Sequence, residues 1–284
     1  MTMMHESKND NGEILGRFVN ISVVMAVWRG DSPDQISAAI DSVLAQTLKP
    51  TEFVVVVDGP VDANIDVCLA PYYQRGEITL LRLPKNVGRG GARNHAINAT
   101  SGQWVAIMDA DDICFPTRIA RQTDFVMRHE VDVLGGLILE FDQVVGDNVS
   151  IRKVPQDHDS VCRMLRRRSA FNHVTLMFRR EIFDQIGGYG PLNYVEDWDF
   201  YLRCENVGAR FANLNMVIVD VRRAISRRRS IAYFREEMCV MNDAYRRRQF
   251  GLADLCVGYA LRVAKLFIPI VLYEFVDKHI LRRY

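Results

Sequence analysis

The sequence predicts an α/β protein whose core is a mostly parallel sheet with helices on both faces. Four short apolar runs rich in β-branched residues occupy 21–27, 53–57, 78–83 and 104–108. Uninterrupted apolar runs of this length are typical of strands that are covered on both faces. Segments with helical periodicity separate them, and this alternation indicates a doubly wound, Rossmann-like sheet. In such sheets ligands bind beyond the carboxyl ends of the strands.

Composition limits the class of protein. The chain of 284 residues is long enough for one large core, and its net charge of +1 gives no general attraction to nucleic acid. The arginine clusters of the second half also lack the interleaved aromatic residues of a nucleic-acid site. Six cysteines show no CxxC spacing, which predicts reduced thiols in a cytoplasmic protein. Residues 1–20 are polar, so we expect a flexible leader and no secretion signal.

The N-terminal half of the domain, residues 21–112, contains the alternating strands and helices. After the first strand, Ser32 is expected to cap a helix, with Pro33 at its first position and Gln35 three residues after the cap. A glycine loop at 88–91 leads from the third strand into a helix at 92–99. Such a loop either cradles a phosphate through its N–H groups or forms a tight turn.

After residue 112 the rhythm of strands and helices changes. Residues 113–222 are expected to form the second half of the same domain, and residues 223–284 a C-terminal helical extension. The expected strands are 131–141, 144–151 and 175–178, and the expected helices are 159–168, 180–186, 196–205, 230–248 and 252–284. The pair Gly187 and Gly188 is a signal that the helix at 180–186 ends there.

The fourth strand runs directly into three carboxylates, Asp109, Asp111 and Asp112. Charge at the rim of a core is costly without a partner, and carboxylates on the same side of an extended backbone repel each other. A divalent cation would relieve the repulsion, because Mg²⁺ and Mn²⁺ prefer carboxylate and phosphate oxygens. The alternative is an acidic turn that starts a helix, with Asp112 or Thr117 near its N-cap.

Cations lie close to the glycine loop. These cations could bind a pyrophosphate, or they could be exposed to solvent at the start of the helix; they are Lys85, Arg89 and Arg93. Asp58 ends the second strand and could accept a hydrogen bond from a base or a ribose, or it could be a turn residue before Gly59.

A second acidic cluster, Glu196-Asp197-Trp198-Asp199, lies far downstream. It either decorates a helix N-terminus or supplies a carboxylate that takes a proton from an attacking hydroxyl. Adjacent residues of a helix point in different directions, so only one of Glu196 and Asp197 should face the first cluster. His173 could line the acceptor side, or it could be structural.

Five blocks of sequence, taken together, resemble the family 2 glycosyltransferases of the GT-A fold. The blocks are AVWRGDSPDQISAAIDSVLAQT, VVVDGP, LPKNVGRGGARNHAINATSGQWVAIMDADD, FNHVTLMFRREIFDQIGGY and VEDWDFYLRC, and they run from about residue 21 to about residue 214. The resemblance includes bacterial enzymes that build O-antigen or capsule. It implies an inverting, metal-dependent transfer of a sugar from a nucleotide diphosphate to a hydroxyl.

The resemblance implies that residues 21–112 bind the nucleotide-sugar and that residues 113–222 form the acceptor-binding, catalytic half of the same domain. It also implies roles for individual residues. The residues that would bind the nucleotide-sugar donor are Val27, Trp28, Asp58, Lys85, Asn86, Arg93 and Asp109. The residues that would face the acceptor are His173, Glu196 and Trp198. Asp111, together with Asp109, would hold Mn²⁺ or Mg²⁺, and Asp197 would be the catalytic base. No QxxRW motif follows the acidic cluster, which favours transfer of a single sugar over processive synthesis.

The segment 252–284 is apolar but interrupted by charges, and it has no run of the roughly 18–20 uncharged residues that a spanning helix requires. Its apolar and basic residues suit a helix that lies on an anionic membrane leaflet. The alternative is a helix that closes the core or pairs with a second subunit in a homodimer.

These features and the resemblance together predict a cytoplasmic glycosyltransferase of a bacterium, either soluble or peripheral on the inner membrane. We expect it to use a UDP-sugar and a lipid-linked or oligosaccharide acceptor, without nucleic acid as a partner. Two other functions stay open at this point: a nucleotidyltransferase, and a nucleotide-sugar-binding protein without catalytic activity.

Overall fold

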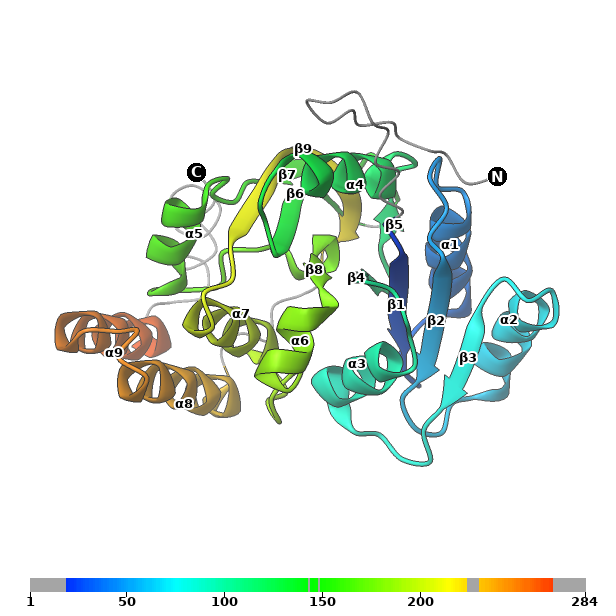
Figure 1. Cartoon of the computed structure of the whole chain (residues 1–284). Helices are drawn as coiled ribbons and strands as arrows, with labels where there is room; N and C mark the ends of the chain where they lie inside the picture. The colour runs from blue at the N-terminus through cyan, green and yellow to red at the C-terminus, as the bar shows by residue number, and fades with distance from the viewer. Residues whose placement is uncertain (1–18, 143, 148, 224–229, 268–284) are drawn as a thin grey trace, which may run out of the picture.

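The computed structural model describes residues 19–142, 144–147, 149–223 and 230–267 (Figure 1). Within these residues one sheet runs in the order β3-β2-β1-β4-β8-β6-β9-β5, and β7 pairs with β6. The strands are β1 Ile21–Val27, β2 Glu52–Val57, β3 Thr79–Arg82, β4 Trp104–Asp109, β5 Ile113–Cys114, β6 Val133–Phe141, β7 Ser150–Arg152, β8 Met177–Arg179 and β9 Phe211–Arg222. The predicted α/β class is confirmed.

The N-terminal half of the sheet is parallel, as predicted. β1 lies between β2 and β4, and its last residue, Val27, is opposite Val57 of β2. β1 has neighbours on both sides and helices on both faces, which explains why its sequence is apolar without alternation. The shared direction brings the carboxyl ends of β1, β2 and β4 to one edge of the sheet. Trp28, Asp58 and Asp109 lie at this edge.

The C-terminal half of the sheet is mixed. β8 is antiparallel to both β4 and β6, whereas β9 is parallel to β6. The sequence-based prediction lacks β9 and the short β5, which pair antiparallel at the end of the sheet. The register of β9 shifts on either side of Leu137 of β6, and this irregularity obscures the period-two pattern of a strand. The strand predicted at 144–151 is wrong in extent, because Asp147 closes a turn with Val144 and only Ser150–Arg152 pairs with β6.

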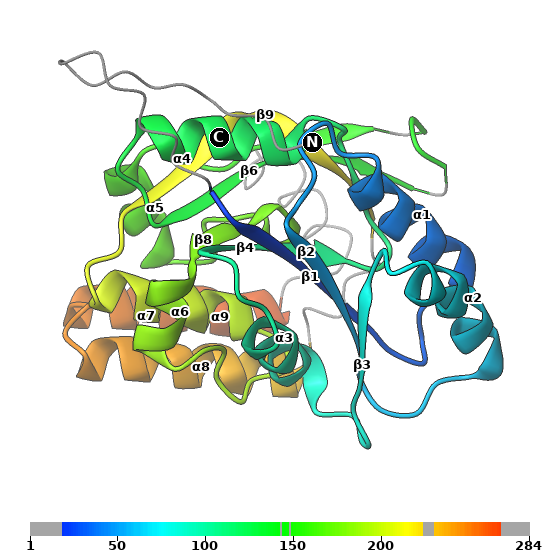
Figure 2. The ribbon, with the colours of Figure 1, turned by 45° about the vertical axis from the view of Figure 1, so that its right-hand side comes forward.

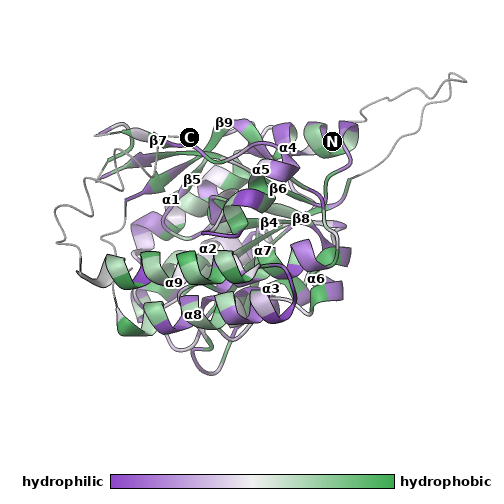
Figure 3. Cartoon of the chain, turned by 90° about the vertical axis from the view of Figure 1, so that its left-hand side faces the viewer, coloured by the Kyte–Doolittle hydropathy of each residue, from purple (hydrophilic) through white to green (hydrophobic). Residues whose placement is uncertain are grey.

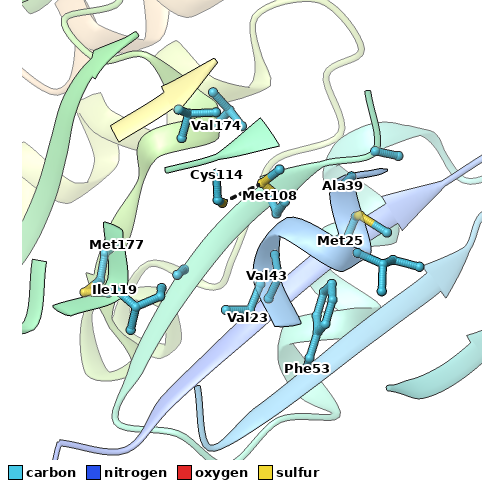
Figure 4. Packing of buried hydrophobic residues seen from close by; sticks show 14 of the residues in the cluster. Val23, Met25, Ala39, Val43, Phe53, Met108, Cys114, Ile119, Val174 and Met177 are labelled. Carbon is cyan, nitrogen blue, oxygen red and sulfur yellow. Dashed lines mark hydrogen bonds between the residues drawn. The ribbon is translucent and has the colours of Figure 1, made fainter. Parts of the chain in front are cut away.

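Helices cover both faces of the sheet and create two cores (Figures 1 and 2). The helices are α1 Pro33–Leu44, α2 Ala63–Gln74, α3 Gly88–Asn98, α4 Arg118–Arg128, α5 His158–Leu165, α6 Arg180–Ile186, α7 Glu196–Asn206, α8 Ile231–Arg246 and α9 Leu252–Phe267, with a 3₁₀ turn η1 at His173–Thr175. α1, α2 and α4 contribute to the first core, where Val23 and Phe53 pack with Ala39 and Val43 of α1 (Figure 4). α3 and α5 to α8 contribute to the second core.

The starts of the helices differ from the prediction in detail. Ser32 does occupy the N-cap of α1, but its side chain makes no capping hydrogen bond, so the predicted capping box is wrong. α3 begins at Gly88, so the four residues 88–91 form its first turn and are not a loop before it. α2 is absent from the prediction, because the exposed Val67 and Tyr73 blur its apolar stripe.

The C-terminal helices α8 and α9 lie near α7, on the side of the molecule opposite α1 and α2 (Figure 1). No helix among the described residues is long and apolar enough to cross a membrane. Nearly all of the predicted leader and the predicted continuation of the last helix, residues 1–18 and 268–284, lie outside the described residues.

Candidate active site

The acidic motif begins with the last residue of β4 and continues into a turn. Asp109 ends the strand, and Ala110 and Asp111 form the turn that follows. We expected both Asp109 and Asp111 in extended backbone, but Asp111 lies in the turn. Both side chains stay partly exposed. Burial raises the pKa of Asp111, and the negative charge of Asp109 raises it further. The predicted repulsion between these two carboxylates is thus present in the folded chain.

Asp112, the third carboxylate, has a different environment. It is only 3% exposed, and its side chain accepts a hydrogen bond of 2.9 Å from the backbone N–H of Arg222 at the end of β9. Burial and the neighbouring Asp111 raise the pKa of Asp112 well above its usual value. Asp112 therefore connects the end of β4 to β9.

Arg93 of α3 joins the two acidic clusters. Its guanidinium donates to Asp109 at 2.9 Å and to Glu196 at 3.1 Å, and its side chain is 8% exposed. Burial opposes the charge of Arg93, but the two carboxylates outweigh it and raise its pKa. Burial alone would raise the pKa of Asp109, yet Arg93 holds that pKa below its usual value. Both of these hydrogen bonds go to carboxylates of the protein, and the expected position of Arg93 near the donor phosphates stays a prediction.

Helix α7 begins with the second cluster, as predicted. Glu196 is buried against Arg93, and burial raises its pKa while Arg93 opposes the rise. Asp197 is half-buried and accepts a hydrogen bond from the backbone N–H of Trp198 at 2.7 Å. The charge of Asp197 also raises the pKa values of Glu196, Tyr189 and Tyr201. Asp197 is therefore close to Arg93 and its two carboxylate partners, Asp109 and Glu196.

Trp198 does not face the acceptor side. Its side chain is buried at 2% exposure, its indole N–H donates to the carbonyl of Leu165 at 2.8 Å, and Arg262 of α9 lies over its ring at 4.8 Å. Trp198 follows Asp197 in the sequence, and the prediction therefore placed both at the site. Adjacent residues of a helix point about 100° apart, however, and Trp198 points into the core.

His173 lies between two phenols. Its Nδ1 is 2.6 Å from the Tyr201 hydroxyl and its Nε2 is 3.3 Å from the Tyr189 hydroxyl. Burial lowers the pKa of His173 well below its usual value, and Arg93 lowers it further. A neutral imidazole can donate from one nitrogen and accept at the other, which matches two hydroxyl partners. His173 thus lies near Arg93 and Asp109, and its expected role on the acceptor side stays a prediction.

The carboxylate of Asp58 is engaged within the protein. It accepts from the backbone N–H groups of Val87 at 2.7 Å and Gly88 at 3.1 Å, so it ties the end of β2 to the start of α3. Gly59 has a φ of +86° and no room for a Cβ, which would lie 2.6 Å from the backbone N of Asn86. This close approach explains the glycine after Asp58. Lys85 and Asn86 are exposed beside it.

At the end of β1, Val27 and Trp28 differ. Val27 is fully buried and its carbonyl accepts from the N–H of Asp58, so its side chain cannot contact a nucleoside. Trp28 is 40% exposed, and its ring lies over Gly30, where any Cβ would meet it at 2.3 Å. Of the two predicted residues, only Trp28 is exposed.

Sequence reasoning missed Asp31. Its carboxylate accepts from the N–H of Trp28 at 2.9 Å, and burial raises its pKa to about 6, with Asp111 and Asp109 adding to the rise. Asp31 therefore adds a negative charge near the DxD pair. The available signal was its place just after the first strand, at the edge where ligands bind.

Arg89 is a further cation at this edge. It is exposed on the first turn of α3, and its charge lowers the pKa values of Asp109, Asp111 and His173. Within the described part of the chain no carboxylate pairs with it. Arg89 can therefore meet an anion without giving up an existing contact.

The residues present fit a divalent cation that shares its coordination with a ligand. Among the described residues no three Asp, Glu, His or Cys side chains converge closely enough to hold a metal ion. Asp109 and Asp111 do offer hard oxygen donors with mutual repulsion. Ions such as Mg²⁺ are commonly held by one or two carboxylates plus substrate phosphates, which is the donor set that this edge could complete.

The order of strands in this sheet, with helices on both faces and the acidic residues at the end of β4, is that of the GT-A fold. The fold is shared with S. aureus TarS (residues 1–349, in complex with UDP), at a TM-score of 0.63 and 19% identity over 91% of this chain and 75% of that one.

The chain belongs to the family described as Glycosyl transferase family 2, which matches residues 22–187. An uncharacterized glycosyltransferase of Haemophilus influenzae is 30% identical over 93% of this chain and 100% of that protein. The UDP-Gal:alpha-D-GlcNAc-diphosphoundecaprenol beta-1,3-galactosyltransferase of Escherichia coli is 28% identical over 93% of this chain and 97% of that protein.

Proposed function

We propose that the chain transfers one sugar, with inversion, from a UDP-sugar to a hydroxyl of a lipid-linked saccharide in surface polysaccharide synthesis. The observation that carries the proposal is the Arg93 bridge, which holds Asp109 of the DxD motif and Glu196 beside Asp197 at one edge of the sheet. The Escherichia coli relative is named for a UDP-galactose donor and a diphosphoundecaprenol acceptor, which supports both substrate classes.

On the donor side, Asp109 and Asp111 would hold Mn²⁺ or Mg²⁺ together with the diphosphate. A bound ion would neutralise the negative charge that develops on the departing nucleoside diphosphate. Arg89 would add a second positive charge, since it is exposed and faces the same carboxylates. Trp28 would cover the nucleoside with its exposed ring.

On the acceptor side, Asp197 would take the proton of the attacking hydroxyl. Glu196 is less suited to this role, because it is buried and hydrogen-bonded to Arg93. The hydrogen bonds of His173 with Tyr189 and Tyr201 would keep the imidazole neutral and oriented beside the acceptor. A direct displacement with one base opposite the leaving group inverts the anomeric centre.

The test of this assignment is the variant Asp197→Asn, assayed with a UDP-sugar, Mn²⁺ and a diphospholipid-linked saccharide. We expect kcat to fall about a hundredfold to ten-thousandfold, the range for loss of a general base, while donor affinity stays unchanged. Asp184→Asn makes the same chemical change at an exposed position of α6 and should retain the wild-type rate.

Two results would contradict the proposal. A near wild-type rate for Asp197→Asn would show that Asp197 is not the catalytic base. Absence of UDP release from the UDP-sugar, together with release of pyrophosphate when UTP and a sugar 1-phosphate are supplied, would indicate a nucleotidyltransferase.

A further inference from the structure

The outward face of α9 is apolar along the part of the helix whose side chains are described, residues 252–264. Leu252 is 63% exposed, Val257 51%, Leu261 56% and Val263 43%. The other exposed side chains of this stretch are also uncharged; they are Ala253, Cys256, Ala260 and Ala264. In Figure 3 much of the ribbon of α9 has the green of hydrophobic residues. A soluble helix normally turns such a face toward a core, so the exposed face of α9 calls for a partner.

The inward face of α9 is firmly attached to the rest of the protein. Arg262 is 6% exposed and contacts three neighbouring elements. It forms an ion pair of 3.2 Å with Glu237 of α8, donates to the carbonyl of Arg167 after α5 at 2.9 Å, and lies over the ring of Trp198 of α7. Because the inward side is already occupied, the apolar side of α9 faces outward.

Cations border the apolar face. Arg166 and Arg167 line a small cavity of about 100 Å³ together with Val257 and Leu261 of α9. The lining also contains one carboxylate, Asp254, but none of the ion pairs of the described residues joins it to either arginine. An apolar helical face with guanidinium groups at its edge matches a surface that presents anionic head groups above acyl chains.

We propose that the outward face of α9, with Arg166 and Arg167 beside it, docks on an anionic lipid membrane surface. The apolar side chains enter the boundary between head groups and acyl chains, while the arginines contact lipid phosphates. A symmetric dimer through this face is less favourable, since an isologous interface would bring the arginines of both copies to the same contact. The inference goes beyond sugar transfer, because docking requires neither donor nor acceptor.

The experiment is flotation of the full chain with lipid vesicles in the absence of nucleotide sugar. Vesicles of phosphatidylcholine alone are compared with vesicles that also contain phosphatidylglycerol. We expect binding that is about tenfold stronger or more on the anionic vesicles and that weakens as salt is added. The double variant Val257→Glu/Leu261→Glu should lose binding to both kinds of vesicle, and Arg166→Gln/Arg167→Gln should lose only the preference for anionic lipid.

The matched control is Val67→Glu on α2, another exposed valine on a helix, distant from α9 (Figure 1). It should float like the wild type, and circular dichroism should show that all variants are folded. Equal flotation of the wild type and the Val257→Glu/Leu261→Glu variant would overturn the proposal. The proposal would also be overturned if the wild type did not bind vesicles but formed a dimer that the Val257→Glu/Leu261→Glu variant cannot form. The partner of this face would then be a second copy of the chain.

Discussion

Arg93 has two carboxylate partners that come from distant parts of the chain. Asp109 lies 16 residues away and Glu196 lies 103 residues away. The two hydrogen bonds place the guanidinium between β4 and α7, in a position with little exposure to water. A buried arginine of this kind maintains the geometry of both clusters, since either carboxylate would be costly without it.

Replacement of Arg93 tests this structural role. Arg93→Met should lower the free energy of unfolding by about 3–5 kcal/mol, because Glu196 and Asp109 lose their cation in a poorly solvated place. Urea denaturation measures the change. Arg89→Met on the same helix is the control; it should alter stability by no more than about 0.5 kcal/mol. Equal stability of the two variants would show that the bridge contributes little.

Asp31 makes stability depend on pH. Its pKa is about 6 in the folded chain against an ordinary value of 3.8, so the folded state keeps this proton over a range in which the unfolded state has lost it. The contribution of Asp31 to stability is therefore full below about pH 4, falls as the pH rises through about 6, and stays low above that.

The variant Asp31→Asn should not show this fall in the free energy of unfolding as the pH rises. At pH 7.5 we expect it to be more stable than the wild type by about 2 kcal/mol, after a discount for partial solvent exposure, and equally stable near pH 4. Unfolding curves at a series of pH values measure the difference. Asp34→Asn, an exposed neighbour, should show no comparable pH-dependent gain. A gain of the same size at both ends of the series would contradict the assignment.

At the scale of elements, α9 and α7 are connected through Arg262. The guanidinium lies over Trp198, the residue that follows Asp197, and pairs with Glu237 of α8. These C-terminal helices lie outside the segment matched by the family, residues 22–187, yet they pack against the helix that carries the proposed base.

Arg262→Met should loosen this end of the molecule. Buried Glu237 would lose its cation, at a cost of about 3 kcal/mol, and hydrogen exchange should become faster in α8 and α9 while β1 and β4 keep their protection. Arg246→Met breaks an exposed pair with Asp243 and should cost less than about 1 kcal/mol. Unchanged exchange in α9 would show that other contacts hold the helix.

At the scale of the whole molecule, β4 joins a parallel half of the sheet to a mixed half, and the proposed site lies at the carboxyl end of this strand. A ligand held at this edge would add contacts that exist only in the folded state. Ligand binding therefore reports on the site through global stability.

UDP with Mn²⁺ should stabilise the protein. At a ligand concentration a hundred times Kd, the gain in the free energy of unfolding is about 2.7 kcal/mol. EDTA should remove most of this gain, and Asp111→Asn should show only the metal-independent part. Thermal shift with UDP, GDP and dTDP, each with and without Mn²⁺, measures the effect and ranks the nucleotides. Full stabilisation by UDP in EDTA would count against the metal site.

Much of the fold could be predicted from local pattern. β1 was expected at its observed bounds, and the helix that ends at Gly187 likewise, because continuous apolar runs and left-handed C-cap glycines are local signals. β9 could not be predicted, because its register shifts beside β6 interrupt the alternation. Trp198 shows the same limit at the site, since its burial depends on α5 and α9, which are distant in sequence.

The sequence by itself determined the α/β class, the place of the DxD carboxylates at the end of a strand, and the second acidic cluster at the start of a helix. The tertiary structure alone decided which groups meet: Arg93 with Glu196, Asp112 with the end of β9, and His173 with two tyrosines. The physical reason is that local patterns arise from backbone geometry and burial over a few residues. Ion pairs and hydrogen bonds across many residues depend on how the elements pack.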